Sequence, residues 1–419
     1  MDDPHRASQP GSTAAQATDA APLADSRYAW RRLAAALLLS TLGGVGMWSV
    51  VVALPAVQAE FGVARGEASL PYTFTMICFG VGGMLLGRLS DRFGVAYAVL
   101  AGSLCLALGY AIASLTGTLW QFALVQGLLI GLGSSATFAP LLADASHWFT
   151  RRRGMAVAII ASGNYLSGTL WPPVLQHFIG SQGWRATYLG VGGFCLMTML
   201  PVVLMLRGRP PRIAVIVKRM HGAASTGLSP RTVQVLLTIA GLSCCVAMSM
   251  PQVHIVAYCA DLGYGPARGA AMLSLMLGFG IVSRITSGWI TDHIGGLRTL
   301  LLGSSLQGLA LLLFIPFDGL ASLYVIAALF GLFQGGIVPS YAIIVREYFP
   351  SQEAGARVGV VIMATVFGVA LGGWMSGAIF DLTGSYRAAF VNGLLWNLVN
   401  VSIATWLLQR GGRRLAPAG

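Results

Sequence analysis

The sequence predicts an all-α polytopic membrane protein with twelve transmembrane helices in two pseudo-symmetric halves of six. Of its 419 residues, 56% are hydrophobic and only 10% charged, whereas a soluble domain carries about 25% charged residues. The apolar residues fall into runs of about 20, the length of a helix that crosses a bilayer core. A charged, glycine-flanked turn between two apolar runs, Gly87–Gly94, recurs in weaker form as Gly288–Gly295 in the second half of the chain.

The spanning segments are expected to be helices. In lipid, each segment must satisfy its own backbone hydrogen bonds, and the two-residue alternation of barrel strands is absent. We expect spans at approximately 33–57, 70–89, 95–115, 119–145, 154–179, 185–206, 232–259, 267–290, 297–316, 321–345, 358–381 and 386–409.

Internal repeats divide these spans into two halves. Gly183-Trp184-Arg185 matches Ser385-Tyr386-Arg387, and Gly131-Leu132 matches Gly331-Leu332. Because six is even, both halves have the same membrane orientation, and a site is expected near the midplane between them. The expected organisation is a disordered tail (1–29), an N-terminal half (30–206), an inter-half loop (207–231), a C-terminal half (232–410) and a second tail (411–419).

The basic residues concentrate on one side of this layout. Of the 26, only Arg65, Arg185, Arg268 and Arg387 fall in loops on the other side, and Arg284 lies within a span. The positive-inside rule therefore predicts cytoplasmic termini, and our interpretation is a bacterial inner (plasma) membrane. The net charge of +12 follows from this distribution and not from a nucleic-acid-binding patch.

Cofactors are not expected. The six cysteines all lie in apolar runs, without the spacing of a disulfide framework or a metal site. No pairing of a nucleophile with a base occurs at membrane depth, which argues against an enzyme.

The Gly87–Gly94 segment, its copy and the layout of six plus six spans resemble the major facilitator superfamily of secondary transporters, over about residues 30–410. The resemblance implies the fold of that family and a cytoplasmic gating role for the segment, the alternative being a role in topology and folding only. The candidate gating residues are Gly87, Asp91, Arg92 and Gly94, with Asp144 and the copy's Gly288 and Asp292 as further members.

Arg284 is the only basic residue deep within a span, and the 14 acidic residues lie in tails, loops or span ends. A guanidinium at this depth is costly and should face a cavity with a partner. With no acid in the surrounding spans, that partner is a substrate carboxylate or, as the structural alternative, helix carbonyls or water.

The stretches 271–288 and 148–163 resemble the monocarboxylate transporter branch, which includes bacterial oxalate/formate-type antiporters. In that branch the matching arginine binds the substrate carboxylate, so the resemblance implies this role for Arg284. Three departures stand out. Gly280 replaces an aspartate tied to proton coupling in several animal members, Trp48 or a neighbour replaces a lysine of span one, and span eleven has no lysine. A single positive charge favours a monoanion over a dianion.

Further polar residues within the spans are candidates for the site. His254 follows Pro251 and could relay a proton, the alternative being a neutral imidazole bonded to its own kinked helix. For the others, the alternative is contact between helices. They are Asn164, Tyr165, Gln252, Tyr258, Gln334 and Tyr341.

These patterns predict a secondary transporter that moves a small, lactate- or pyruvate-like monocarboxylate by alternating access, with H⁺ as the favoured coupled ion. The alternatives are an anion exchanger of the oxalate/formate type, a drug/H⁺ antiporter, or a membrane sensor or scaffold. Two observations argue against the drug/H⁺ antiporter. Span five lacks the Gly-Pro-rich run of drug exporters, and the spans contain no buried acid that could bind a cationic drug. The sequence names neither the acid nor the oligomeric state.

Overall fold

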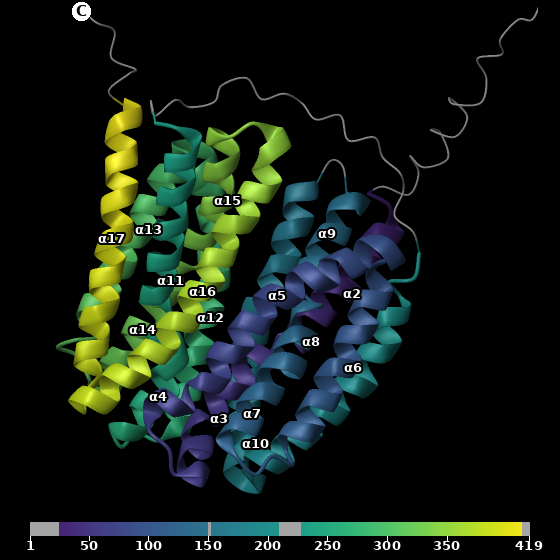
Figure 1. The fold of residues 1–419 in the computed structure, drawn as a ribbon, viewed down its shortest axis with the longest axis vertical. Coiled ribbons are helices and arrows are strands. Elements are labelled where there is room, and N and C mark those ends of the chain that lie inside the picture. Colours follow the sequence, from purple (N-terminus) through teal and green to yellow (C-terminus); the bar gives the residue numbers. More distant parts are fainter. Residues whose placement is uncertain (1–24, 150–151, 209–227, 413–419) are drawn as a thin grey trace, which may run out of the picture.

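The computed structural model describes residues 25–149, 152–208 and 228–412. Every regular element in these ranges is a helix, and the helices run side by side along the long axis of the molecule (Figure 1). Two groups of helices are apparent, α2–α10 and α11–α17.

The first group comprises α2 (Arg27–Gly43), α3 (Val45–Phe61), α4 (Arg65–Ala68), α5 (Leu70–Phe93), α6 (Val95–Ala113), α7 (Leu119–Val125), a π-helical segment (Gln126–Gly131), α8 (Leu132–Ser135), α9 (Ala139–Trp148) and α10 (Arg153–Leu204). The second comprises α11 (Pro230–Asp261), α12 (Pro266–Ile294), α13 (Gly296–Leu313), α14 (Leu320–Gln334), α15 (Ile337–Tyr348), α16 (Ser351–Thr383) and α17 (Tyr386–Gly412).

Helix α10 contains two spans. At Gly183 the backbone adopts φ 82° and ψ 161°, a region that glycine enters without steric cost. The chain turns back there. The evidence is that Trp171 and Phe194, which lie before and after Gly183, have ring centroids only 5.8 Å apart. With α10 divided, the 11 apolar segments of membrane length in the described ranges hold twelve spans. The all-α membrane fold predicted from the sequence is confirmed.

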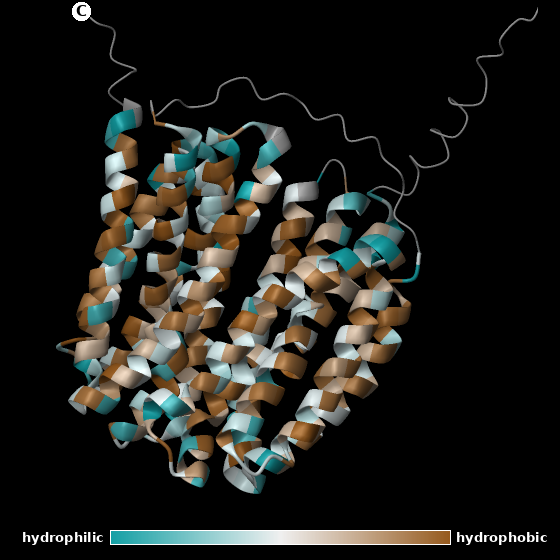
Figure 2. Cartoon of the chain, in the orientation of Figure 1, coloured by the Kyte–Doolittle hydropathy of each residue, from teal (hydrophilic) through white to brown (hydrophobic). Residues whose placement is uncertain are grey.

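The outside of the bundle is apolar along most of its length (Figure 2). Large side chains such as Met84, Leu128, Met197 and Val325 are more than half exposed. An apolar surface of this extent would be unfavourable in water but matches the hydrocarbon core of a bilayer. The protein is therefore a multi-pass membrane protein.

The two groups meet along a seam made by α5 against α16 and α10 against α12. On the first side, the Thr73 hydroxyl donates to the Ala370 carbonyl at 3.1 Å, and the Tyr72 ring lies against Gly373. On the second side, Leu277 lies against Gly168 and the Ser274 hydroxyl donates to the Thr169 carbonyl. Small residues let these helix backbones approach closely.

The seam does not run the full length of the bundle. Gly80 still contacts Met363 of α16, whereas a side-chain carbon at Gly87, about 10 Å further along α5, would meet no atom within 4 Å. On the α10–α12 side, Arg284 contacts α10, but Gly288, one turn on, has no such neighbour. We call this the Asp91 end and the opposite one, where α4 lies, the Arg65 end. The groups join at the Arg65 end and separate at the Asp91 end (Figure 1).

Two spans are interrupted near their middles at repeat-related positions. The helical path breaks at residues 136–138, between α8 and α9, and at Gly335-Gly336, between α14 and α15. Just before each break a glycine packs on a neighbouring backbone, Gly131 on Thr75 and Gly331 on Met276. Carbonyl groups at a helix end lack intrahelical partners, so each break makes backbone oxygens available to neighbours.

Three segments expected from the sequence, the tails at 1–29 and 411–419 and the inter-half loop at 207–231, fall largely outside the described residues. Their character and the boundaries of the two halves stay predictions.

Candidate functional site

Arg284 lies on α12 where the seam ends. Its Nη1 donates to the Ala161 carbonyl of α10 at 2.8 Å, and its Nε lies 3.4 Å from the Gly335 carbonyl at the break after α14. The guanidinium carbon lies 4.4 Å from the centroid of the Tyr165 ring. Within the described part of the chain, no carboxylate stands at ion-pair distance from it. The charge is therefore stabilised by carbonyl dipoles and an aromatic face but not neutralised.

Gly280 explains how Tyr165 reaches Arg284. A side-chain carbon at position 280 would collide with the Tyr165 ring, so the absence of a side chain lets the ring pack closely against α12. An aspartate at this position, as in several animal members of the resembling branch, would have no room. The departure noted in the sequence is thus a packing feature that places a ring, and no carboxylate, one turn from Arg284.

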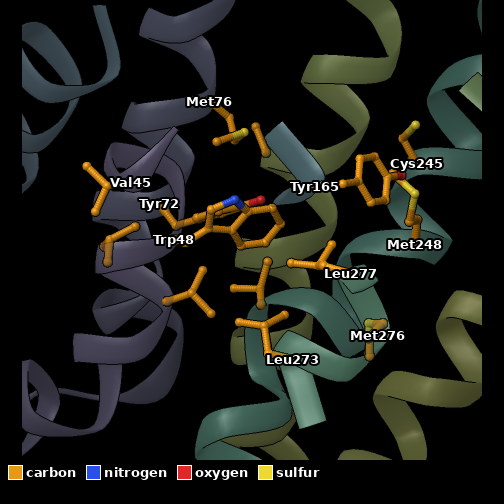
Figure 3. Packing of buried hydrophobic residues seen from close by; sticks show 14 of the residues in the cluster. Val45, Trp48, Tyr72, Met76, Tyr165, Cys245, Met248, Leu273, Met276 and Leu277 are labelled. Carbon is orange, nitrogen blue, oxygen red and sulfur yellow. The ribbon is translucent and has the colours of Figure 1, made fainter. Parts of the chain in front are cut away.

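An apolar wall adjoins Tyr165 at the seam. Figure 3 shows Trp48 lying among Tyr72 and Met76 of the first group and Leu273 and Leu277 of the second. The Trp48 indole donates to the Asn164 carbonyl at 3.3 Å. Because the wall takes side chains from both groups, any movement of one group against the other changes its shape.

Gln252, Gln334 and Asn164 are the amide side chains that the sequence offered for the site, and the first two are buried. Gln252 donates from Nε2 to Gln334 Oε1 at 3.1 Å. Within the described ranges, Gln334 Nε2 and Asn164 Oδ1 find no hydrogen-bond partner. Buried polar atoms are seldom left unpaired, so these atoms are candidates for a ligand or an ordered water molecule.

His254 lies on the other side of the midplane, toward the Arg65 end. Its Nε2 lies 2.8 Å from the Gly373 carbonyl and its Nδ1 3.1 Å from the Tyr386 hydroxyl. A carbonyl can only accept, so Nε2 carries a proton and Nδ1 of the neutral ring accepts from Tyr386. Tyr258, packed edge-on against Tyr386 and Phe390, belongs to the same cluster. Sequence reasoning grouped both with Arg284; the structure links them to the Arg65 end.

Tyr341 joins helices of the second group. Its hydroxyl donates to Asn400 Oδ1 at 2.8 Å, and Asn400 in turn donates to the Ser304 hydroxyl at 2.7 Å. These bonds tie α15, α17 and α13 together. The contacts fit the structural alternative raised for Tyr341, and its role as a lining residue stays a prediction.

The repeated charged segments lie at the Asp91 end. Asp91, Arg92 and Gly94 are exposed, and the Arg92 guanidinium lies over the Phe93 ring, 5.1 Å from its centroid. The turn expected over Gly87–Gly94 is wrong, because α5 stays helical to Phe93 and only Gly94, at φ 100°, leaves the helix and joins α5 to α6. In the copy, Asp292 is likewise exposed. The segments lie beyond the end of the seam, where a latch between the groups would be disengaged.

Asp144 lies at the same end but has its own partner. Both of its oxygens accept from Arg32 of α2, from Nε at 2.8 Å and Nη2 at 2.9 Å, and both side chains are buried. Arg32 also donates to the Leu206 carbonyl at 2.8 Å. Asp144 shares a cavity of about 420 Å³ with Gly94 and Arg207. It therefore borders the segment, while its charge is paired within the first group.

One polar cluster was missed from the sequence. Arg65 binds Asp261 and Tyr386, which belong to the other group. The available signal was that Arg65 is one of the few arginines on the side of the membrane expected to be poor in basic residues. Pairing with distant acids could not be deduced, because no local spacing relates residues so far apart in the chain.

Comparison with known proteins agrees with this architecture. The family model described as Major Facilitator Superfamily matches residues 36–323 and 288–418. Curated relatives include Monocarboxylate transporter 13 of Bos taurus, 32% identical over 306 residues (72% of this chain, 71% of the relative). Monocarboxylate transporter 11 of Mus musculus is 28% identical over 389 residues (88% and 84%). An MFS-type transporter of Gibberella moniliformis is 25% identical over 358 residues (82% and 85%).

Solved structures share the fold. The peptide transporter POT in complex with alafosfalin superposes with a TM-score of 0.71 at 13% identity, covering 90% of this chain and 95% of that one. A bacterial homolog of the human lysosomal transporter Spinster gives 0.67 at 13% identity, covering 93% and 96%. Two helical groups, repeat-related broken spans and a match over nearly the whole chain lead to one conclusion: this protein is a transporter of the Major Facilitator Superfamily.

Proposed function

We propose that this transporter carries a small organic monocarboxylate, of the lactate or pyruvate type, by alternating access. The observation that carries the proposal is Arg284: a permanent positive charge at the seam between the groups, with no carboxylate partner in the described residues. A carboxylate would supply the missing negative charge with matching fork geometry.

The surroundings of Arg284 support exchange of one partner for another. Its contacts are two backbone carbonyls and a ring face, each weaker than a bidentate pair with a carboxylate. A carboxylate can therefore replace a backbone carbonyl as the acceptor for Arg284. Because Ala161 belongs to the first group and Arg284 to the second, this exchange also alters a bond across the seam.

The substrate class follows from the neighbouring side chains. A single arginine suits a single carboxylate, and the wall of Trp48, Leu273 and Leu277 suits a short apolar body. The monocarboxylate transporters among the curated relatives support the same class.

The proposed coupling is to H⁺. Arginine does not release its proton, so a different group has to titrate, and His254 is the one histidine that is buried among the residues that the structure describes. We place both termini and the Asp91 end in the cytoplasm, as the positive-inside rule predicts. The Arg65 end then faces outward, and the structure corresponds to a carrier closed to the outside.

Uptake by proteoliposomes tests the proposal. Purified protein should accumulate ¹⁴C-lactate or pyruvate when the external medium is acidified, and an ionophore that collapses the proton gradient should abolish accumulation. Uptake that requires a trapped internal anion and ignores the gradient would identify an exchanger of the oxalate/formate type. Absence of flux for every short carboxylate, in protein that binds none of them, would refute the carboxylate assignment. Thermal-shift screening over carboxylates supplies the binding measurement.

A further inference from the structure

The Arg65 end of the seam carries a network of charged and polar groups that is separate from the Arg284 site. Arg65 donates from Nη1 and Nη2 to the two oxygens of Asp261, both at 3.0 Å, and from Nη1 to the Tyr386 hydroxyl at 2.7 Å. The Arg65 side chain is 9% exposed and that of Asp261 34%. Its guanidinium carbon also lies 4.8 Å from the centroid of the Phe380 ring. Every partner belongs to the other group of helices.

A second carboxylate holds the backbone at the same place. Asp381, at the end of α16, accepts from the Arg65 amide at 2.8 Å and the Gly66 amide at 2.7 Å. Substituting the Arg65 side chain would leave these two bonds intact. The network thus has a side-chain part, Arg65 with Asp261 and Tyr386, and a backbone part formed by Asp381.

The internal repeat shows what is unusual about the side-chain part. In the first group, Glu60 ends α3 and binds both Trp184 and Arg185 at the start of the sixth span. The repeat-related elements of the second group are Asp261, at the end of α11, and Tyr386-Arg387, at the start of α17. Asp261 does not bind Arg387, which pairs with Asp318 instead. Asp261 binds Arg65 of the first group.

The same structural position is therefore used in two ways. Glu60 closes an ion pair within its own group, which remains intact however the two groups move as rigid bodies. Asp261 closes an ion pair across the seam, which must break whenever the Arg65 end opens. An alternating-access carrier has to open that end once in each cycle.

We propose that Arg65, Asp261 and Tyr386 form the gate at this end of the carrier, and that His254 connects the gate to the interior. The chain of bonds runs from Arg65 through the Tyr386 hydroxyl to His254 Nδ1, and from His254 Nε2 to the Gly373 carbonyl of α16. Gly373 itself lies against Tyr72 of α5 on the seam. A change in the bonding of His254 is thereby transmitted to the ion pair that holds the groups together.

The proposal rests on the transport cycle proposed above but not on the carboxylate, so it is tested without substrate. Spin labels at Ala59 and Leu382, exposed residues of opposite groups at the Arg65 end, report their separation by pulsed electron resonance. The background replaces the partly exposed Cys78 and Cys105 with alanine. The variants are Asp261→Asn and Arg65→Gln, and the matched control is Arg185→Gln, which breaks an ion pair within one group.

We expect Asp261→Asn and Arg65→Gln to add a longer-distance population, raising the open fraction about tenfold, which corresponds to about 1.4 kcal/mol. Arg65→Lys should give a smaller rise, because lysine keeps the charge but loses the bidentate geometry. Arg185→Gln should leave the distances unchanged. The gate proposal would be refuted if folded variants at Arg65 and Asp261 gave the same label distances as the parent. It would also be refuted if Arg185→Gln lengthened these distances equally. The carboxylate assignment is unaffected by either outcome.

Discussion

Arg65 and Arg284 are two arginines at opposite ends of one seam, and they differ in whether the protein neutralises their charge. Arg65 faces the carboxylate of Asp261 and a tyrosine hydroxyl, so its charge is neutralised by the protein. Arg284 faces carbonyl oxygens and a tyrosine ring, so its charge is not. The difference separates a contact that holds the protein together from a group that can receive an anion.

The largest expected effect is on transport by Arg284→Gln. Charge-assisted hydrogen bonds contribute about 1.5–3 kcal/mol, so we expect carboxylate uptake to fall by about 100-fold. Arg284→Lys should recover little, because an ammonium cannot form the bidentate pair. Uptake rates in proteoliposomes, normalised to folded protein, measure this. A variant that transports at a parental rate would show that Arg284 only joins helices.

The next prediction gives Arg284 a carboxylate partner within the protein, as Arg65 has in Asp261. Gly288 lies one turn after Arg284 on α12, and a side chain there meets no neighbour within 4 Å. An aspartate at this position would supply an internal carboxylate and compete with the substrate. We expect Gly288→Asp to raise KM by about tenfold, equivalent to about 1.4 kcal/mol.

Gly288→Asn is the matched control for this prediction, since it has the same size without the charge. Both variants lose the same glycine, so any effect on the helix cancels in the comparison. Equal KM values for Gly288→Asp and Gly288→Asn would mean that a carboxylate beside Arg284 does not compete with the substrate. That result would contradict binding of the substrate by Arg284.

Tyr165 offers a smaller perturbation of the same arginine. Tyr165→Leu removes the ring under the guanidinium, a contact worth about 1 kcal/mol, and should raise KM roughly fivefold. Tyr165→Phe keeps the ring and should stay close to the parent. The pair of variants, measured by uptake kinetics, isolates the ring face from the hydroxyl. A large defect in Tyr165→Phe would assign the role to the hydroxyl instead.

The smallest expected effect on transport comes from the ion pair within one group. Glu60→Gln removes the carboxylate charge and one of the two oxygens that accept from Trp184 and Arg185. It should lower the melting temperature, with a loss of about 1 kcal/mol in unfolding free energy, because the pair is partly exposed. Transport per folded molecule should persist. Asp261→Asn should show the reverse, with a smaller change in melting and a larger one in transport. Identical behaviour of the two variants would remove the distinction between them.

Much of the candidate site was visible in the sequence because charge in a membrane is rare. Arg284 stood out as the one basic residue within a span, and Asp91 with Asp292 stood out as members of a repeated charged motif. Their surroundings were not visible. Tyr165 lies against Arg284 only because Gly280 leaves room for the ring. Asp144 does not join the Asp91 segment but pairs with Arg32 of α2, which lies 112 residues away in the chain.

The amino-acid sequence by itself determined that the chain forms a helical bundle of two related groups in a membrane. Span length, hydropathy and the internal repeat are local properties, and in lipid they leave the backbone few alternatives. The tertiary structure decided which charges meet. Arg65 pairs with Asp261, whereas Arg284 has no carboxylate partner among the described residues. This difference depends on how distant spans pack across the seam, and no periodicity along the chain encodes that packing.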